Sequence, residues 1–252
     1  MIHFVGAGPG APDLITLRGA ELLRTADAII YAGSLIDPAL LDYARQGCEL
    51  HNSARMTLDE VVAVLLNVHR AGKTAVRLHS GDPSVYGAIR EQMDLLKAEG
   101  VPYDVCPGVS SFCGAAAALK AEYTLPRVSQ SVIITRRTGR TPVPERESIT
   151  SFAAHGATMV IFLSAGMTDA LQRELLCGGY GADTPAAIVY KASWPDERVF
   201  RCTVGTLAGT AAQNGISNHA LILVGGFLGG DYELSKLYDP AFTTAFRQGR
   251  EA

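Results

Sequence analysis

The chain of 252 residues lacks long hydrophobic runs and a strong net charge. Its longest apolar stretch, Ala220 to Leu228, contains two glycines and falls well short of the roughly 18 residues that a membrane helix needs. A formal net charge of -3 gives no reason to expect nucleic acid or an anionic membrane as a partner. The first residues also lack the apolar stretch of a signal peptide. We therefore expect a cytoplasmic protein that binds neither nucleic acid nor membranes.

Cysteine and histidine do not form the patterns of a disulfide framework or a metal site. The six histidines show no H-x-x-x-H or Cys/His spacing, so we expect no protein-bound metal. No Ser-His-Asp, Cys-His or paired-carboxylate arrangement stands out as catalytic machinery. The odd number and wide spacing of the cysteines are typical of reduced thiols. The five are Cys48, Cys106, Cys113, Cys177 and Cys202.

Short apolar runs alternate with helix-like patterns over the first half of the chain. This alternation indicates an α/β fold whose mainly parallel sheet is covered by helices. We expect strands at Ile2–Val5, Ala28–Tyr31, Glu49–His51, Thr74–Leu78 and Tyr103–Val105. We expect helices near Thr16–Arg24, Pro38–Tyr43, Leu58–Arg70, Ser84–Glu99 and Ser110–Leu119.

After about Glu122 the predicted strands lie closer together, and the last three have short links that favour antiparallel pairing in a mixed sheet. We therefore predict two α/β domains, residues 1–118 and 119–252. The expected elements are a strand after Gln130, strand Thr158–Phe162, helix Met167–Cys177, and strands Ala186–Lys191, Val199–Thr203 and Leu221–Val224.

The segment after the first strand comes close to a dinucleotide-binding fingerprint. The glycines and an alanine of FVGAGPGAPD, Phe4 to Asp13, satisfy the spacing G-x-G-x-x-[GA]. Pro9 and Pro12 nevertheless oppose a helix directly after the glycines, and the first good N-cap is Thr16. The next strand, Ala28–Tyr31, does not end in the acidic residue that would bind the ribose. A dinucleotide-dependent oxidoreductase is therefore only an alternative hypothesis.

Three segments rich in glycine, proline and small polar residues each follow a predicted strand. They are Gly6–Asp13, His79–Gly87 and Cys106–Phe112. Because the carboxyl ends of parallel strands meet at one edge of a sheet, we expect these loops to converge where α/β folds bind ligands. Ser110 and Ser111 would offer hydroxyl groups and helix N-terminal amides there. Each loop alone could equally be ordinary turn chemistry.

The chain resembles the tetrapyrrole (corrin/porphyrin) methylases, and the similarity covers essentially its whole length. The first loop shares the G-x-G-P-G pattern of Gly6, Gly8, Pro9 and Gly10, followed by Leu14-Ile15-Thr16. His219 occupies a position that is proline in many members. Further matches are Gly81–Gly87, Pro107–Ser111, Phe162–Met167 and Ser217–Gly226.

The resemblance implies S-adenosylmethionine as the methyl donor, two α/β domains with a cofactor cleft between them, and a homodimer. Its segments Tyr31–Asp37 and His51–Glu60 are most similar to members that methylate C11 of precorrin-4 in cobalamin biosynthesis. Small and apolar residues would surround the adenine, while Asp82 and the serines would bind the polar parts. The implied cofactor residues are Pro9, Ser80, Gly81, Asp82, Val85, Ser110, Ser111, Met167, Ala192 and Ala220.

A tetrapyrrole substrate with acetate and propionate groups would need cations near the site. Arg55, Arg136, Arg137 and Lys191 are the main candidates, and Arg77 and Arg140 also lie near predicted strand ends, although each could equally be a solvated surface residue. From their place in the matched segment, Tyr31 and Ser34 are the candidates for assisting a proton transfer.

Other functions stay open at this point. The same fold could methylate another tetrapyrrole position, in uroporphyrinogen III or precorrin-2, or act on a protein or RNA. A module that binds tetrapyrrole without turnover is the non-enzymatic alternative.

Overall fold

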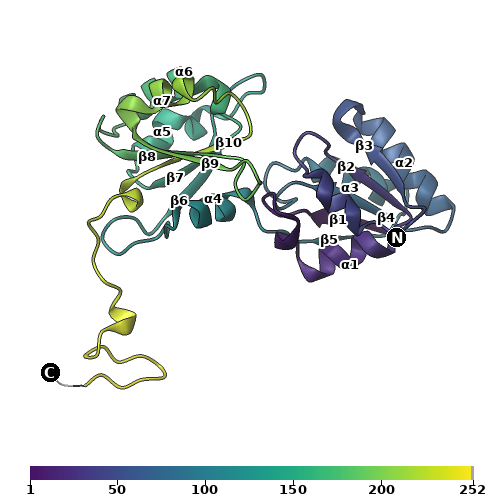
Figure 1. Ribbon diagram of the computed structural model, residues 1–252, viewed down its shortest axis with the longest axis horizontal. Coiled ribbons are helices and arrows are strands. Elements are labelled where there is room, and N and C mark those ends of the chain that lie inside the picture. The colour runs from purple at the N-terminus through teal and green to yellow at the C-terminus, as the bar shows by residue number, and fades with distance from the viewer. Residues whose placement is uncertain (251–252) are drawn as a thin grey trace. The chain divides into compact units, whose positions relative to one another are not determined.

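The computed structural model describes residues 1–250, which form two compact units (Figure 1). The first unit comprises Met1–Ala118 together with Lys191–Arg198, and the second comprises Leu119–Tyr190 and the chain from Val199 onward. Each unit contains one five-stranded sheet. The assignment of residues 1–118 and 119–252 to separate domains stays a prediction, because compactness does not show independent folding.

The sheet of the first unit is parallel throughout, as the alternating sequence predicts. Its strand order is β3-β2-β4-β1-β5, so β1 and β4 are central and their carboxyl ends lie side by side. The strands are β1 (Ile2–Gly6), β2 (Ala28–Tyr31), β3 (Glu49–Asn52), β4 (Ala75–His79) and β5 (Tyr103–Cys106).

Two apolar layers cover this sheet. Successive residues of β4 belong to different layers: Val76 and Leu78 pack in one cluster with α1, and Ala75 packs in another with α2. By the same alternation Arg77 and His79 face the α2 side. The helices are α1 (Leu17–Thr25), α2 (Leu58–Arg70), α3 (Ile89–Ala98) and α4 (Ser111–Leu119).

The predicted N-cap at Thr16 is confirmed, and the helix predicted at Leu58–Arg70 has these bounds, with Thr57 as its N-cap. The Thr16 hydroxyl accepts a hydrogen bond from the amide of Gly19 at 3.0 Å, and Thr57 forms a capping box with Glu60. The predicted helix Pro38–Tyr43 is a 3-10 helix.

One predicted helix was wrong at its N-terminal end. We expected a helix from Ser84, but α3 begins at Ile89. The reason lies in the backbone, because Tyr86 and Ala88 have φ angles of 55° and 48°, which belong to the left-handed region and interrupt a right-handed helix.

The second unit has the mixed sheet that was predicted. Strand β10 (Ala220–Val224) is antiparallel to both β7 (Thr158–Phe162) and β8 (Pro185–Tyr190). β6 (Val132–Arg136) is parallel to β7, and the order is β6-β7-β10-β8-β9, with β9 at Arg198–Thr203. The helices are α5 (Ile149–Ala153), α6 (Thr168–Cys177) and α7 (Leu207–Gln213), of which α5 and α7 were not predicted. Within residues 1–250, no helix combines the length and the apolar character needed to cross a bilayer.

Candidate functional site

The first two glycine-containing loops are joined by a pair of backbone hydrogen bonds. The amide of Gly81 donates to the carbonyl of Gly8 at 2.8 Å, and the amide of Gly8 donates to the carbonyl of Gly81 at 3.2 Å. Both residues have positive φ angles, 83° and 62°, which explains the use of glycine at these positions. The loops after β1 and β4 therefore form one continuous edge.

The third loop packs against the same edge without any side chain between the backbones. A Cβ atom added to Gly108 would lie 2.2 Å from the carbonyl oxygen of Gly81 and 2.7 Å from the Cα of Gly6. The position of a Cβ on Gly81 is 3.3 Å from the amide nitrogen of Ser111, at the start of α4. The three loops thus converge as their place after parallel strands predicts, and they bring together Gly81, Asp82, Ser110 and Ser111.

Asp82 links two of these loops through its carboxylate. One oxygen accepts a hydrogen bond from the Gly108 amide at 2.8 Å, and the other accepts from the amide of Ser84 at 2.9 Å and from the Ser84 hydroxyl. Burial opposes ionisation of this carboxyl group, but the bonds from Ser84 and Gly108 outweigh it and hold its pKa below the usual value. The ionised Asp82 carboxylate therefore links the loop after β4 to the loop after β5.

We expect Asp82→Ala to weaken binding of S-adenosylhomocysteine by at least 1 kcal/mol, because the Gly108 amide loses its acceptor and the two loops lose their link. Titration calorimetry would measure the dissociation constant. Ser84→Ala is the matched control, since it removes one bond to the carboxylate but keeps the bond from Gly108. Equal affinity in Asp82→Ala and the wild type would exclude Asp82 from the site.

The segment Lys191–Arg198 covers the first loop within the same unit. The Ala11 amide donates to the Ser193 hydroxyl at 3.0 Å, and a Cβ on Gly10 would lie 2.1 Å from Cδ1 of Trp194. Pro9 and Ala192 both lie beside Gly114 of α4. Two predicted cofactor residues, Pro9 and Ala192, are thus brought together. Trp194, the only tryptophan of the chain, was not among the predicted site residues.

Backbone strain gathers in the predicted binding segments. Of eight non-glycine residues with positive φ among residues 1–250, six lie in or beside the matched motifs or flank Ala192. Such conformations cost on the order of 1 kcal/mol each and persist where the surrounding structure fixes them, often at functional sites. The six are Tyr86, Ala88, Leu163, Lys191, Ser193 and His219.

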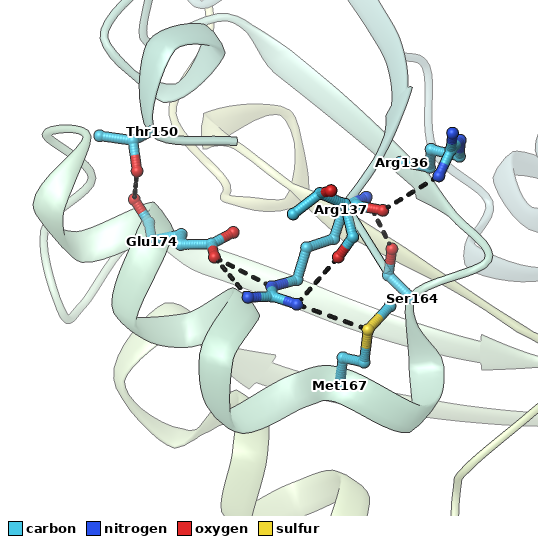
Figure 2. A network of polar contacts seen from close by, with 7 residues as sticks. Arg136, Arg137, Thr150, Ser164, Met167 and Glu174 are labelled. Atoms are coloured by element: carbon cyan, nitrogen blue, oxygen red, sulfur yellow. Dashed lines mark hydrogen bonds and ion pairs between the residues drawn. The ribbon is translucent and has the colours of Figure 1, made fainter. Parts of the chain in front are cut away.

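In the second unit Arg137 is held by the protein itself. Its guanidinium donates twice to one carboxylate oxygen of Glu174, at 2.7 and 3.0 Å, and lies 3.5 Å from the sulfur of Met167 (Figure 2). The amide of Arg137 donates to the Ser164 hydroxyl. Met167, a predicted cofactor residue, therefore contacts a predicted substrate residue.

The other predicted substrate cations differ in their surroundings. The Arg136 guanidinium donates to the carbonyls of Thr141 and Pro142 at 3.1 and 2.8 Å. These bonds stabilise the loop that follows β6. The ammonium group of Lys191 lies 2.7 Å from a carboxylate oxygen of Asp196. Arg55 is exposed. Their roles in substrate binding stay predictions.

The remaining predicted residues lie at strand ends or within the loops. Tyr31 ends β2 and its carbonyl accepts a hydrogen bond from the Ser53 hydroxyl, while Ser34 follows in an exposed turn. Their catalytic role stays a prediction. Ser80 and Val85 lie in the half-buried loop after β4, and Ala220 begins β10.

The chain belongs to the tetrapyrrole (corrin/porphyrin) methylases, whose family model matches residues 1–208. It is 49% identical over 251 residues to a cobalt-precorrin-4 C(11)-methyltransferase of Methanocaldococcus jannaschii, covering 99% of this chain and 97% of that protein. A solved cobalt precorrin-4 methyltransferase, described as a cobalamin biosynthetic enzyme, superposes with a TM-score of 0.89 at 47% identity and covers 91% of this chain and 96% of its own. The uroporphyrin-III C-methyltransferase of Thermus thermophilus, solved with S-adenosylhomocysteine, has a TM-score of 0.76 at 27% identity, with coverage of 90% and 98%. The fold and loop motifs therefore define a methyltransferase.

Proposed function

We propose that this protein transfers a methyl group from S-adenosylmethionine to C11 of precorrin-4, giving precorrin-5. The convergence of the loops after β1, β4 and β5 carries this proposal, because it concentrates backbone amides, hydroxyl groups and the Asp82 carboxylate at one sheet edge. Such an edge suits a ligand with a ribose and an amino-acid moiety. Two of the relatives named above are described as cobalt-precorrin-4 methyltransferases, one of them acting at C11, which supports a precorrin-4 acceptor.

In this proposal the protein contributes mainly positioning. S-adenosylmethionine supplies an electrophilic methyl group, and a reduced tetrapyrrole has electron-rich carbons of its own, so no strong base is needed at the acceptor. Holding the reacting atoms in line can be worth about 7–11 kcal/mol at best. Pro9, Gly81 and Ser110 stiffen or shape the loop edge, and Tyr31 and Ser34 are the proposed groups for moving a proton.

The finer assignments are also part of the proposal. The substrate carboxylates would be bound by Arg55, Arg136, Arg137 and Lys191, with Arg137 exchanging or sharing its partner Glu174. Met167 and Ala220 are proposed to contact the cofactor. We further infer a cytoplasmic homodimer, which agrees with the five free cysteines and with the resemblance.

Incubation with methyl-labelled S-adenosylmethionine and precorrin-4 tests the function. We expect one labelled methyl group per product molecule, located at C11 by NMR. Parallel incubations with cobalt-precorrin-4 and with uroporphyrinogen III compare the metal-containing acceptor and the alternative position. Labelling of uroporphyrinogen III alone, or binding of precorrin-4 without transfer, would contradict the proposal.

A further inference from the structure

Arg77 is a buried cation without an ionic partner among residues 1–250. It is 7% exposed, and burial lowers the pKa of its guanidinium to about 10. Nε donates to the side-chain oxygen of Gln92 at 3.1 Å, and Nη1 donates to the carbonyl of Ile30 at 3.2 Å. The second terminal nitrogen, Nη2, makes no hydrogen bond within the described chain. Because a buried charge is costly unless it is paired, an anion placed against this guanidinium would be stabilised.

The guanidinium lines a hollow at the carboxyl end of the first sheet, between β4, α2 and α3. The hollow has a volume of about 190 Å³, far above the roughly 10–15 Å³ that a single water needs on the same measure. Arg77 and Gln92 are buried, whereas Thr57, Ala88 and Glu91 in the lining are exposed. The hollow is therefore open to solvent, and its volume is sufficient for a group of several atoms beside the cation.

The electrostatic surroundings favour an anion in this hollow. The N-terminal end of α3, at Ala88, contributes to its lining, and helix N-termini attract negative charge. The N-terminal end of α2 does not add to this, because Thr57 and Glu60 cap it. Ala88 provides no side-chain cap, so the first-turn amides of α3 retain donor capacity. Among the described lining residues only Glu91 carries a carboxylate, and it is exposed whereas Arg77 is buried.

The hollow adjoins the loop that is proposed to bind the cofactor. This loop begins after His79, carries Asp82 in its first half, and closes the hollow with Gly87 and Ala88 at its far end. A group bound against Arg77 would therefore belong to a ligand that occupies the same sheet edge. Both the tetrapyrrole and the amino-acid part of the cofactor carry carboxylates.

We propose that this hollow binds a peripheral carboxylate of the tetrapyrrole, held by the Nη2 group of Arg77 and the N-terminus of α3. The proposal rests on the function proposed above and adds a substrate-anchoring residue to it. An acetate or propionate side chain has the length to enter a hollow while its macrocycle stays outside, whereas the cofactor's carboxylate is tied to an amino group that a buried guanidinium would repel.

Titration calorimetry with two probes tests the assignment: uroporphyrin III, a stable porphyrin with carboxylate side chains, and S-adenosylhomocysteine. Arg77→Met removes the charge, and Leu58→Trp fills the hollow from the start of α2 while keeping Arg77 and its hydrogen bonds. We expect each variant to bind uroporphyrin III at least tenfold more weakly and S-adenosylhomocysteine within twofold of the wild type. Arg90→Met is the control, because it removes an exposed cation of α3 that does not line the hollow.

The results separate the possible sources of the anion. Loss of S-adenosylhomocysteine binding with unchanged uroporphyrin binding would assign the hollow to the cofactor and overturn the proposal. Unchanged binding of both probes by a folded Leu58→Trp variant would also overturn it, even if Arg77→Met does not fold. If either of these results is obtained while the wild type methylates precorrin-4, the proposed function is retained and only the proposed role of Arg77 is rejected.

Discussion

Replacing Gly108 with alanine is expected to weaken binding of S-adenosylhomocysteine at least tenfold and to destabilise the first unit by about 1–3 kcal/mol. The added methyl group would lie 2.2 Å from the carbonyl oxygen of Gly81 and 2.7 Å from the Cα of Gly6. Both contacts are with backbone, so the loops must separate to make room. That separation would break the edge formed by the Gly8–Gly81 hydrogen bonds and the bond from Gly108 to Asp82.

Calorimetry gives the affinity, and fluorescence of Trp194 follows the stability of the first unit, because this single tryptophan packs against Gly10 there. Gly209→Ala is the control. It lies inside α7, a Cβ there meets nothing within 4 Å, and alanine favours a helix by up to about 1 kcal/mol over glycine. A Gly108→Ala variant that binds like the wild type would show that the backbone contact between these loops does not shape the site.

Much of the loop edge was predictable because its signals are local. Apolar runs bounded by glycine and proline locate the parallel strands, and the carboxyl ends of parallel strands must share an edge, so the meeting of Gly8, Gly81 and Gly108 follows from topology. The caps at Thr16 and Thr57 are equally local, since each depends on residues three positions apart.

The features that were missed depend either on an unusual local backbone conformation or on contacts between distant residues. The N-terminal end of α3 is delayed by the left-handed Tyr86 and Ala88, and the chain around Gly87 is so tight that a Cβ there would lie 2.1 Å from the carbonyl oxygen of Pro83. Trp194 reaches Gly10 across more than 180 positions, which no pattern in either segment reveals.

The arginines illustrate the same limit for charge. Sequence alone suggests that Arg137 is available for a ligand, but Glu174, 37 positions away, occupies two of its donors. Arg77 shows the reverse situation, since it lies in the middle of an apolar strand and yet retains unpaired donors beside a hollow. The availability of a cation for a ligand is therefore decided by its tertiary partners, which occupy Arg137 more fully than the Nη2 group of Arg77.

His79 should make the protein markedly less stable in mild acid. Burial, with a smaller contribution from the charge of Arg77, lowers the pKa of His79 to about 3, and its Nε2 atom has no hydrogen-bond partner among the described residues. The unfolded chain takes up a proton near pH 6.5, whereas the folded chain does so only near pH 3. The contribution of His79 to the free energy of unfolding is therefore fully present above pH 6.5. Below that pH it is lost at about 1.4 kcal/mol per pH unit, which amounts to about 2 kcal/mol at pH 5.

Urea unfolding followed by Trp194 fluorescence at pH 7 and pH 5 measures this loss in the first unit, to which both residues belong. His79→Leu should abolish most of the difference between the two pH values, because leucine fills the apolar site and cannot titrate. His155→Leu removes an exposed histidine of the second unit and should keep the wild-type difference. If the wild type and His79→Leu lose the same free energy of unfolding between pH 7 and pH 5, the protonated imidazole is accommodated beside Arg77. Accommodation of that second positive charge would require an anion or water in this part of the sheet, which connects the pH dependence directly to the chemistry of the hollow.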